Sequence, residues 1–110
     1  METRQAITAL GALAQESRLA VFRLLVRTGP QGMAASKIAE QVGIAPSSLS
    51  FHLKELSIAG LVSARQEGRF VIYAANFGAM NDLVGFLTDN CCGGNPCSPA
   101  SACKPEKAKA

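Results

Sequence analysis

The residue types best suited to chemistry in this chain are four cysteines gathered near its carboxyl end. Cys91 and Cys92 are adjacent, Cys97 follows a Gly-Gly-Asn-Pro segment, and Cys103 comes six residues later, whereas the first 90 residues contain no cysteine. A cysteine used only for packing can occur anywhere in a hydrophobic core. Their confinement to one segment therefore predicts chemistry at sulfur, either binding of a soft metal or metalloid or a redox reaction.

The composition places these thiols in a small globular protein. The chain has 110 residues, of which 48% are hydrophobic and 17% charged, and this predicts one domain with a modest core. The first residues lack the apolar run of a signal peptide, and no segment reaches membrane-spanning length, so we expect a cytoplasmic protein with no membrane partner. In a reducing cytoplasm, clustered cysteines are more often metal-binding or redox-active than disulfide-bonded. The net charge of +3 favours an anionic partner only weakly.

The hydrophobic pattern predicts a mainly α fold with one β-hairpin. We expect five helices: residues 4–14, Ser17 (as cap) to a stop at Gly29-Pro30, Ser36 (as cap) to Gly43, Pro46 to about Ala59, and a helix capped by Asn76 with the apolar stripe Phe77, Met80, Leu83, Val84 and Leu87. Two strands, 61–65 and 69–75, flank the turn Gln66-Glu67-Gly68. Residues 1–90 form the predicted domain, and the Gly, Pro, Ser, Ala and Lys content of residues 91–110 predicts a flexible tail.

The fourth helix has the features of a DNA-reading helix. Leu49, Leu53 and Leu56 share the face that must be buried. The remaining surface carries candidate DNA-binding residues, since short hydroxyls contact phosphates or base edges and an apolar ring can meet a thymine methyl: Ser47, Ser48, Ser50, Phe51, His52 and Lys54. Alone, such a face is more typical of a solvated helix with one stray aromatic than of a DNA-reading helix.

The neighbouring elements favour the DNA-binding interpretation. A short helix, a tight link and a second helix form a helix-turn-helix, and the following hairpin makes it winged. Arg65 and Arg69 flank the wing turn, where they could reach phosphates or the minor groove, although charge that keeps an edge hairpin soluble is the alternative. His52 is the only histidine and is assigned to packing or a phosphate contact rather than to a metal. No acid–base constellation can be assembled, so we do not expect an enzyme.

These motifs resemble the ArsR/SmtB family of small winged-helix repressors. The resemblance covers residues 5–90 and is carried by Ser17-Arg18-Leu19, the reading-helix run from Pro46 to Leu56, Ala59-Gly60-Leu61-Val62, and the wing from Glu67 to Tyr73. It implies a homodimer packed through the first and fifth helices, bound to a pseudo-palindromic operator and released by an inducer. The apolar fifth helix and the alanine-rich first helix independently offer more apolar surface than a lone domain needs.

The cysteines depart from the best-known arsenic and cadmium sensors of that family, which place a Cys-x-Cys pair in the third helix. They resemble an arsenite-responsive subgroup with adjacent cysteines just after the fifth helix and a third a few residues later. This resemblance implies arsenite or antimonite as inducer, no required cofactor, and Cys91, Cys92 and Cys97 as ligands, with Cys103 as a further candidate.

Several alternatives remain open for the cysteine segment. Four thiolates would suit zinc, although Cys-x-x-Cys spacing is absent; methylated arsenite needs only Cys91 and Cys92; and a disulfide would make a redox switch. The choice between Cys97 and Cys103, the subunit that supplies the third thiol, and the operator sequence are not determined by the sequence.

Overall fold

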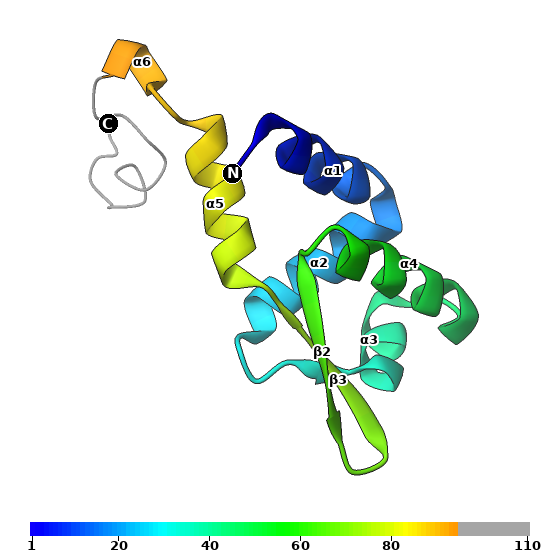
Figure 1. Ribbon diagram of the computed structural model, residues 1–110. Coiled ribbons are helices and arrows are strands. Elements are labelled where there is room, and N and C mark those ends of the chain that lie inside the picture. The colour runs from blue at the N-terminus through cyan, green and yellow to red at the C-terminus, as the bar shows by residue number, and fades with distance from the viewer. Residues whose placement is uncertain (95–110) are drawn as a thin grey trace.

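The computed structural model describes residues 1–94 and leaves the side chain of Cys92 undescribed. Helices surround a small antiparallel sheet whose hairpin projects from one side of the molecule (Figure 1). The elements in chain order are α1 (Thr3–Leu13), α2 (Glu16–Thr28), β1 (Met33–Ala34), α3 (Ala35–Val42), α4 (Pro46–Ile58), β2 (Val62–Glu67), β3 (Phe70–Ala75), α5 (Phe77–Leu87) and α6 (Cys91–Gly94). The predicted winged helix-turn-helix, mainly α with a β-hairpin wing, is confirmed.

The core lies where α1 to α4 converge. The face of α4 that the sequence assigns to the interior is buried, with Leu49 and Leu53 each 2% exposed and Leu56 fully enclosed. They pack in one cluster with the largest side chains of the neighbouring elements: Val21, Phe22, Leu25, Ile38, Leu61 and Val62. The contribution of α1 is made by its small residues Ala6 and Ala9. Small residues on this face let α1 approach closely. Leu13 packs against the cluster from the end of the helix, whereas Ile7 and Leu10 are exposed.

The helix ends confirm some predicted caps and correct others. Pro46 begins α4, and Asn76 caps α5 by accepting a hydrogen bond from the Ala79 N–H (3.1 Å). Gly43 ends α3 with a left-handed φ of 80°. The prediction of Ser17 as a cap is wrong, because Ser17 lies inside α2, which begins at Glu16. The N-cap is Gln15, whose side chain accepts a hydrogen bond from the Arg18 N–H.

The predicted cap Ser36 is also wrong. The third helix begins at Ala35, and Ala34 occupies the N-cap position with no side-chain hydrogen bond. Ala34 belongs to β1 as well, so its extended backbone is held by pairing with Ile72 of β3. The sheet therefore sets the start of this helix in place of a capping side chain.

The turn of the wing is shorter than predicted. Strand β2 continues to Glu67, which pairs with Phe70, so the turn consists of Gly68 and Arg69 rather than of residues 66–68. Gly68 has a φ of 60° whereas Arg69 does not have a positive φ, which is the type II′ pattern that matches the twist of a hairpin. Arg69 is therefore at the tip of the wing rather than beside it.

A third strand, β1, was not predicted. It contributes only two residues, which pair with Tyr73 and Ile72 of β3, so the sheet order is β1-β3-β2. The chain approaches β3 through Gly32, whose φ is 75° and where an added Cβ would lie 2.5 Å from the Tyr73 carbonyl oxygen. Only glycine fits this approach. Within residues 1–94, no helix has the length and apolar character needed to cross a membrane.

Candidate nucleic-acid interface

The exposed face of α4 carries five of the eight side chains that the sequence assigns to DNA. Ser47, Ser48 and Ser50 lie exposed in its first turns, and Lys54 is exposed one turn further along. Phe51 is 56% exposed, which is unusual for an aromatic residue in a helix whose other face is fully buried. The face thus offers hydroxyl groups, one cation and one apolar ring on a single surface, the set that major-groove contacts use.

The link from α3 holds α4 in its orientation. The N–H groups of Gly43 and Ile44 both donate to the Ala39 carbonyl oxygen, at 2.8 and 3.2 Å, and this closes the end of α3. The Leu49 N–H then donates to the Ala45 carbonyl oxygen (2.9 Å), so α4 starts almost at once. Two helices joined by so short a link keep a fixed angle, as a helix-turn-helix needs.

His52 lies half-buried at the border of this face. Its Nδ1 atom is 3.3 Å from Nη1 of Arg18, and its ring meets the Phe51 ring edge-on with centroids 5.8 Å apart. Arg18 also donates from Nε to the Ala12 carbonyl oxygen (2.7 Å). The predicted location of His52 is confirmed, but its link to Arg18 was not predicted, because 34 residues separate the two and no local spacing relates them.

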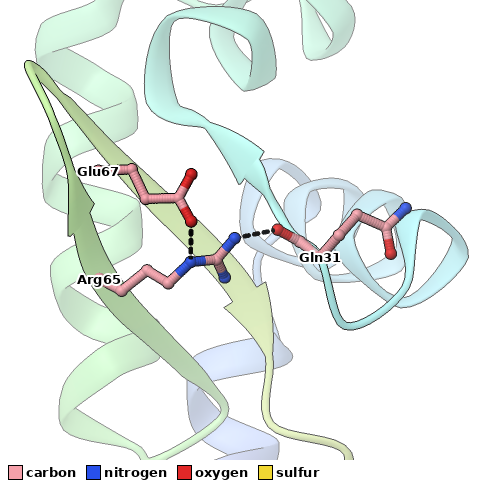
Figure 2. Close-up of polar contacts among 3 residues, drawn as sticks. All are labelled: Gln31, Arg65 and Glu67. Atoms are coloured by element: carbon pink, nitrogen blue, oxygen red, sulfur yellow. Dashed lines mark hydrogen bonds and ion pairs between the residues drawn. The ribbon is translucent and has the colours of Figure 1, made fainter.

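The two wing arginines have different surroundings. Arg65 of β2 donates from Nε to Glu67 Oε2 and from Nη2 to the Gln31 carbonyl oxygen, both at 2.7 Å (Figure 2). It therefore ties the wing to the loop between α2 and β1. Arg69 lies exposed at the wing turn, and it is the arginine placed to meet a surface beyond the protein.

Large apolar side chains are exposed on α1 and α5, which lie near each other in the molecule (Figure 1). Ile7 and Leu10 of α1 are 64% and 42% exposed, and Val84 and Leu87 of α5 are 40% and 58% exposed. Val84 also lines a groove of about 460 Å³, together with residues of α1, α2 and α5: Leu13, Leu19, Phe22, Arg23, Val26, Arg27, Met80 and Leu83. Helices α1 and α5 thus present the kind of exposed apolar side chains that interfaces cover.

The cysteine segment begins directly beyond α5. Asn90 has a φ of 57°, which breaks the helical direction, and the short helix α6 then starts at Cys91. The Cys91 side chain is half-buried, and its N–H donates to the Thr88 carbonyl oxygen (2.9 Å). The predicted tail thus starts with a helical turn at residues 91–94.

The proposed set of thiol ligands extends past this turn. Cys97 and Cys103 lie outside the described residues, so the metal-binding role of the four cysteines stays a prediction. Within residues 1–94, no three His, Cys, Asp or Glu side chains are grouped closely enough to hold a metal ion.

Comparison with known proteins agrees with this geometry. Residues 13–64 match a family model described as a helix-turn-helix domain, which spans α2 through the start of β2. Over 80 residues the chain is 34% identical to the nodulation protein NolR of Rhizobium meliloti; the match covers 73% of this chain and 63% of NolR. The chain therefore spans less than two thirds of the length of this curated relative.

Solved structures extend the similarity to the whole winged domain. An ArsR-like transcriptional regulator from Rhodococcus sp. RHA1 is 25% identical with a TM-score of 0.68, covering 76% of each chain. The homodimeric winged helix-turn-helix DNA-binding domain of a possible ArsR-family transcriptional regulator from Mycobacterium bovis is 31% identical, with a TM-score of 0.63 and coverage of 79% of this chain and 81% of that one. Both are named as transcriptional regulators and neither as an enzyme, in agreement with the sequence prediction.

Proposed function

The chain belongs to the ArsR family of winged helix-turn-helix transcriptional regulators, and on this basis we propose that it is a cytoplasmic repressor released from operator DNA by trivalent arsenic or antimony. It binds the operator as a homodimer, and thiolates of its carboxyl-terminal cysteines bind the inducer. The observation that carries the proposal is the position of Cys91 and Cys92, which follow α5 and its exposed apolar face after a link of three residues.

The surface of α4 supports the DNA-binding part. Its N-terminal turns carry exposed serines next to an exposed Phe51 and Lys54, so one face can enter the major groove while hydroxyls contact the backbone. Arg69 at the wing tip extends the cationic surface toward the neighbouring phosphates.

The exposed apolar residues of α1 and α5 support the homodimer. Ile7, Leu10, Val84 and Leu87 are more exposed to water than a stable lone domain of this size favours. A second copy covers them by a two-fold contact, which also sets the two reading helices at the spacing of an operator with two half-sites. The similar Mycobacterium bovis domain is homodimeric.

The chemistry of trivalent arsenic and antimony supports the inducer. Both are thiophilic and take three sulfur ligands in a pyramid; adjacent Cys91 and Cys92 supply two, and Cys97 or Cys103 supplies the third. Binding orders the chain that leaves α5 and favours a dimer geometry that no longer matches the operator. By linkage, operator DNA must weaken metalloid binding by the same factor.

The test is a titration of the operator complex with arsenite under strong reductant. It uses a promoter fragment that the wild type protects, and the four single Cys→Ser variants. Cys91→Ser and Cys92→Ser should each abolish release, and whichever of Cys97→Ser or Cys103→Ser also does so identifies the third ligand. Release by arsenite in both Cys91→Ser and Cys92→Ser overturns the assignment.

Two further arms of the same titration separate the alternative inducers. Release by peroxide without metalloid, reversed by reductant, would replace metalloid sensing by a thiol redox switch. Release by zinc but not by arsenite would make the four thiolates a zinc site.

A further inference from the structure

Arg18 connects three helices through one side chain. It lies in the first turn of α2, half-buried, and its Nε–H donates to the Ala12 carbonyl oxygen in the last turns of α1 (2.7 Å). Its Nη1 atom lies 3.3 Å from Nδ1 of His52 on α4. The guanidinium has a fixed planar fork, so the contact with α1 also fixes the direction from which Arg18 approaches the His52 ring.

The contact with Arg18 determines where the proton of His52 lies. A guanidinium is permanently protonated and only donates, so Nδ1 must offer its lone pair for a hydrogen bond to form. A neutral imidazole has one N–H, and when Nδ1 accepts, that proton is on Nε2. A proton on Nδ1 would instead turn two donors toward each other at 3.3 Å.

The surroundings of His52 indicate what the Nε2–H group can reach. The ring is half-buried and flanked by the exposed Phe51 ring, so it lies at the margin of the reading face rather than at its centre. Side chains at the margin of a groove-bound helix meet the sugar–phosphate backbone, and phosphate oxygens only accept hydrogen bonds. An N–H directed away from Arg18 fits such an acceptor, and the nearby guanidinium charge strengthens the attraction to it.

We propose that Arg18 is a positioning residue that fixes the Nε2–H tautomer of His52 and thereby gives the reading helix an oriented donor for a DNA phosphate. This inference rests on the proposed DNA binding. It differs from a simple structural role for Arg18, because it assigns a definite protonation pattern to one ring and predicts that the two residues act on DNA affinity as a unit.

The tautomer is measured first, without DNA. His52 is the only histidine, so a long-range proton–nitrogen NMR spectrum of the full chain at about pH 8 reports this ring alone. In the wild type we expect two widely separated ring-nitrogen resonances, with the proton on Nε2. In Arg18→Met, which keeps the aliphatic stem and loses the donors, exchange with the Nδ1–H form should move the two resonances toward each other. Arg23→Met, which removes an exposed cation from the same helix, should leave them unchanged.

Operator affinity is measured next, on the intact dimer at one fixed salt concentration. Arg18→Met and His52→Ala should each weaken binding at least tenfold, because each subunit of the dimer loses one hydrogen bond to a charged phosphate. The double variant should be no weaker than either single variant, because both remove the same contact. His52→Gln, which keeps a side-chain N–H₂ near the position of Nε2, should recover most of the affinity, whereas His52→Asn, which keeps an acceptor near Nδ1, should not.

Specific results overturn the inference. A wild-type ring protonated on Nδ1, a spectrum unaffected by Arg18→Met, or additive losses in the double variant would each do so. If Arg18→Met fails to fold, Arg18→Lys replaces it, since one ammonium group cannot bond both Ala12 and His52 in the same geometry. A wild-type protein that binds no promoter fragment refutes the proposed function, while the NMR result still decides the tautomer independently.

Discussion

Helices α4 and α5 have similar lengths but opposite surfaces. On α4 the three leucines are buried to 2% exposure or less, and the exposed face carries serines, a lysine and one aromatic ring. On α5 only Leu83 is buried, while Val84 and Leu87 are 40% and 58% exposed. The single chain therefore completes the packing of α4 and leaves that of α5 unfinished. A helix whose apolar face is buried within one chain can present polar groups to a ligand. A helix with exposed apolar side chains is instead stabilised by contact with another apolar surface.

The two helices also differ in which proposed binding site they carry, the DNA-reading face on α4 and the inducer-binding cysteines beyond α5. The serines of α4 lie at the amino-terminal end of the reading helix, whereas Cys91 and Cys92 belong to α6 beyond the carboxyl end of α5, and α6 and the tip of the wing lie at opposite ends of the molecule in Figure 1. A ligand bound by these cysteines acts first on the helix whose packing depends on a partner. In the proposed repressor, regulation thus works through the dimer rather than through the reading face.

The largest expected effect tests the completed packing of α4. Leu53→Ala should lower the free energy of unfolding by about 2–5 kcal/mol, because the side chain is 2% exposed and its loss leaves a cavity in the core. Urea unfolding at one protein concentration measures this change. Ser50→Ala on the exposed face of the same helix is the control and should stay within about 0.5 kcal/mol of the wild type. Equal losses in the two variants would contradict the assignment of the two faces.

The next effect tests the unfinished packing of α5. Leu87→Glu puts a charge in the exposed apolar surface and should raise the dimer dissociation constant at least tenfold, about 1.4 kcal/mol, because a buried unpaired carboxylate opposes association. Sedimentation equilibrium measures the constant. Gln41→Glu, at an exposed position of α3, adds the same charge outside α1 and α5 and serves as the control. A Leu87→Glu protein that remains as strongly dimeric as the wild type would mean that α5 is covered in some other way.

The smallest effect distinguishes the two arginines of the wing. Arg69→Ala should reduce the slope of log affinity against log salt by about 1.8 for a dimer with two wings, since each lost phosphate contact contributes about 0.9. Arg65→Ala should leave the slope close to that of the wild type, because hydrogen bonds to Gln31 and Glu67 hold its guanidinium and the Glu67 carboxylate offsets its charge. Operator titrations between low and moderate salt measure both slopes. If Arg65→Ala reduced this slope more than Arg69→Ala does, Arg65 would have to leave Gln31 and Glu67 when DNA binds.

Much of the fold follows from the sequence because its signals are local. Proline at the start of α4, Gly43 at the end of α3, Asn76 before α5 and the glycine at the wing turn each act on the backbone within a few residues, and each lies at or within one residue of its predicted place. The buried leucines of α4 follow from helical periodicity in the same way.

The two cap predictions fail for different reasons, one local and one set by a distant segment. Ser17 and Ser36 are good caps in isolation, but Gln15 caps α2 and the pairing of β1 with β3 starts α3. The packing also decides how the apolar residues of α1 divide, with Ala6 and Ala9 in the core and Ile7 and Leu10 outside, because the closeness of the neighbouring helices determines which side chains fit.

The sequence by itself determined the winged helix-turn-helix, the reading face and the clustering of the thiols, since composition and short-range spacing carry that information. Only the tertiary structure decided that Arg65 is tied to the α2–β1 loop, that Arg69 occupies the wing tip, and that Arg18 meets His52. Two of these results are contacts between residues 34 positions apart in the sequence, Gln31 with Arg65 and Arg18 with His52. A directional bond between such distant positions depends on how whole helices and strands pack, and no local pattern of residues encodes it.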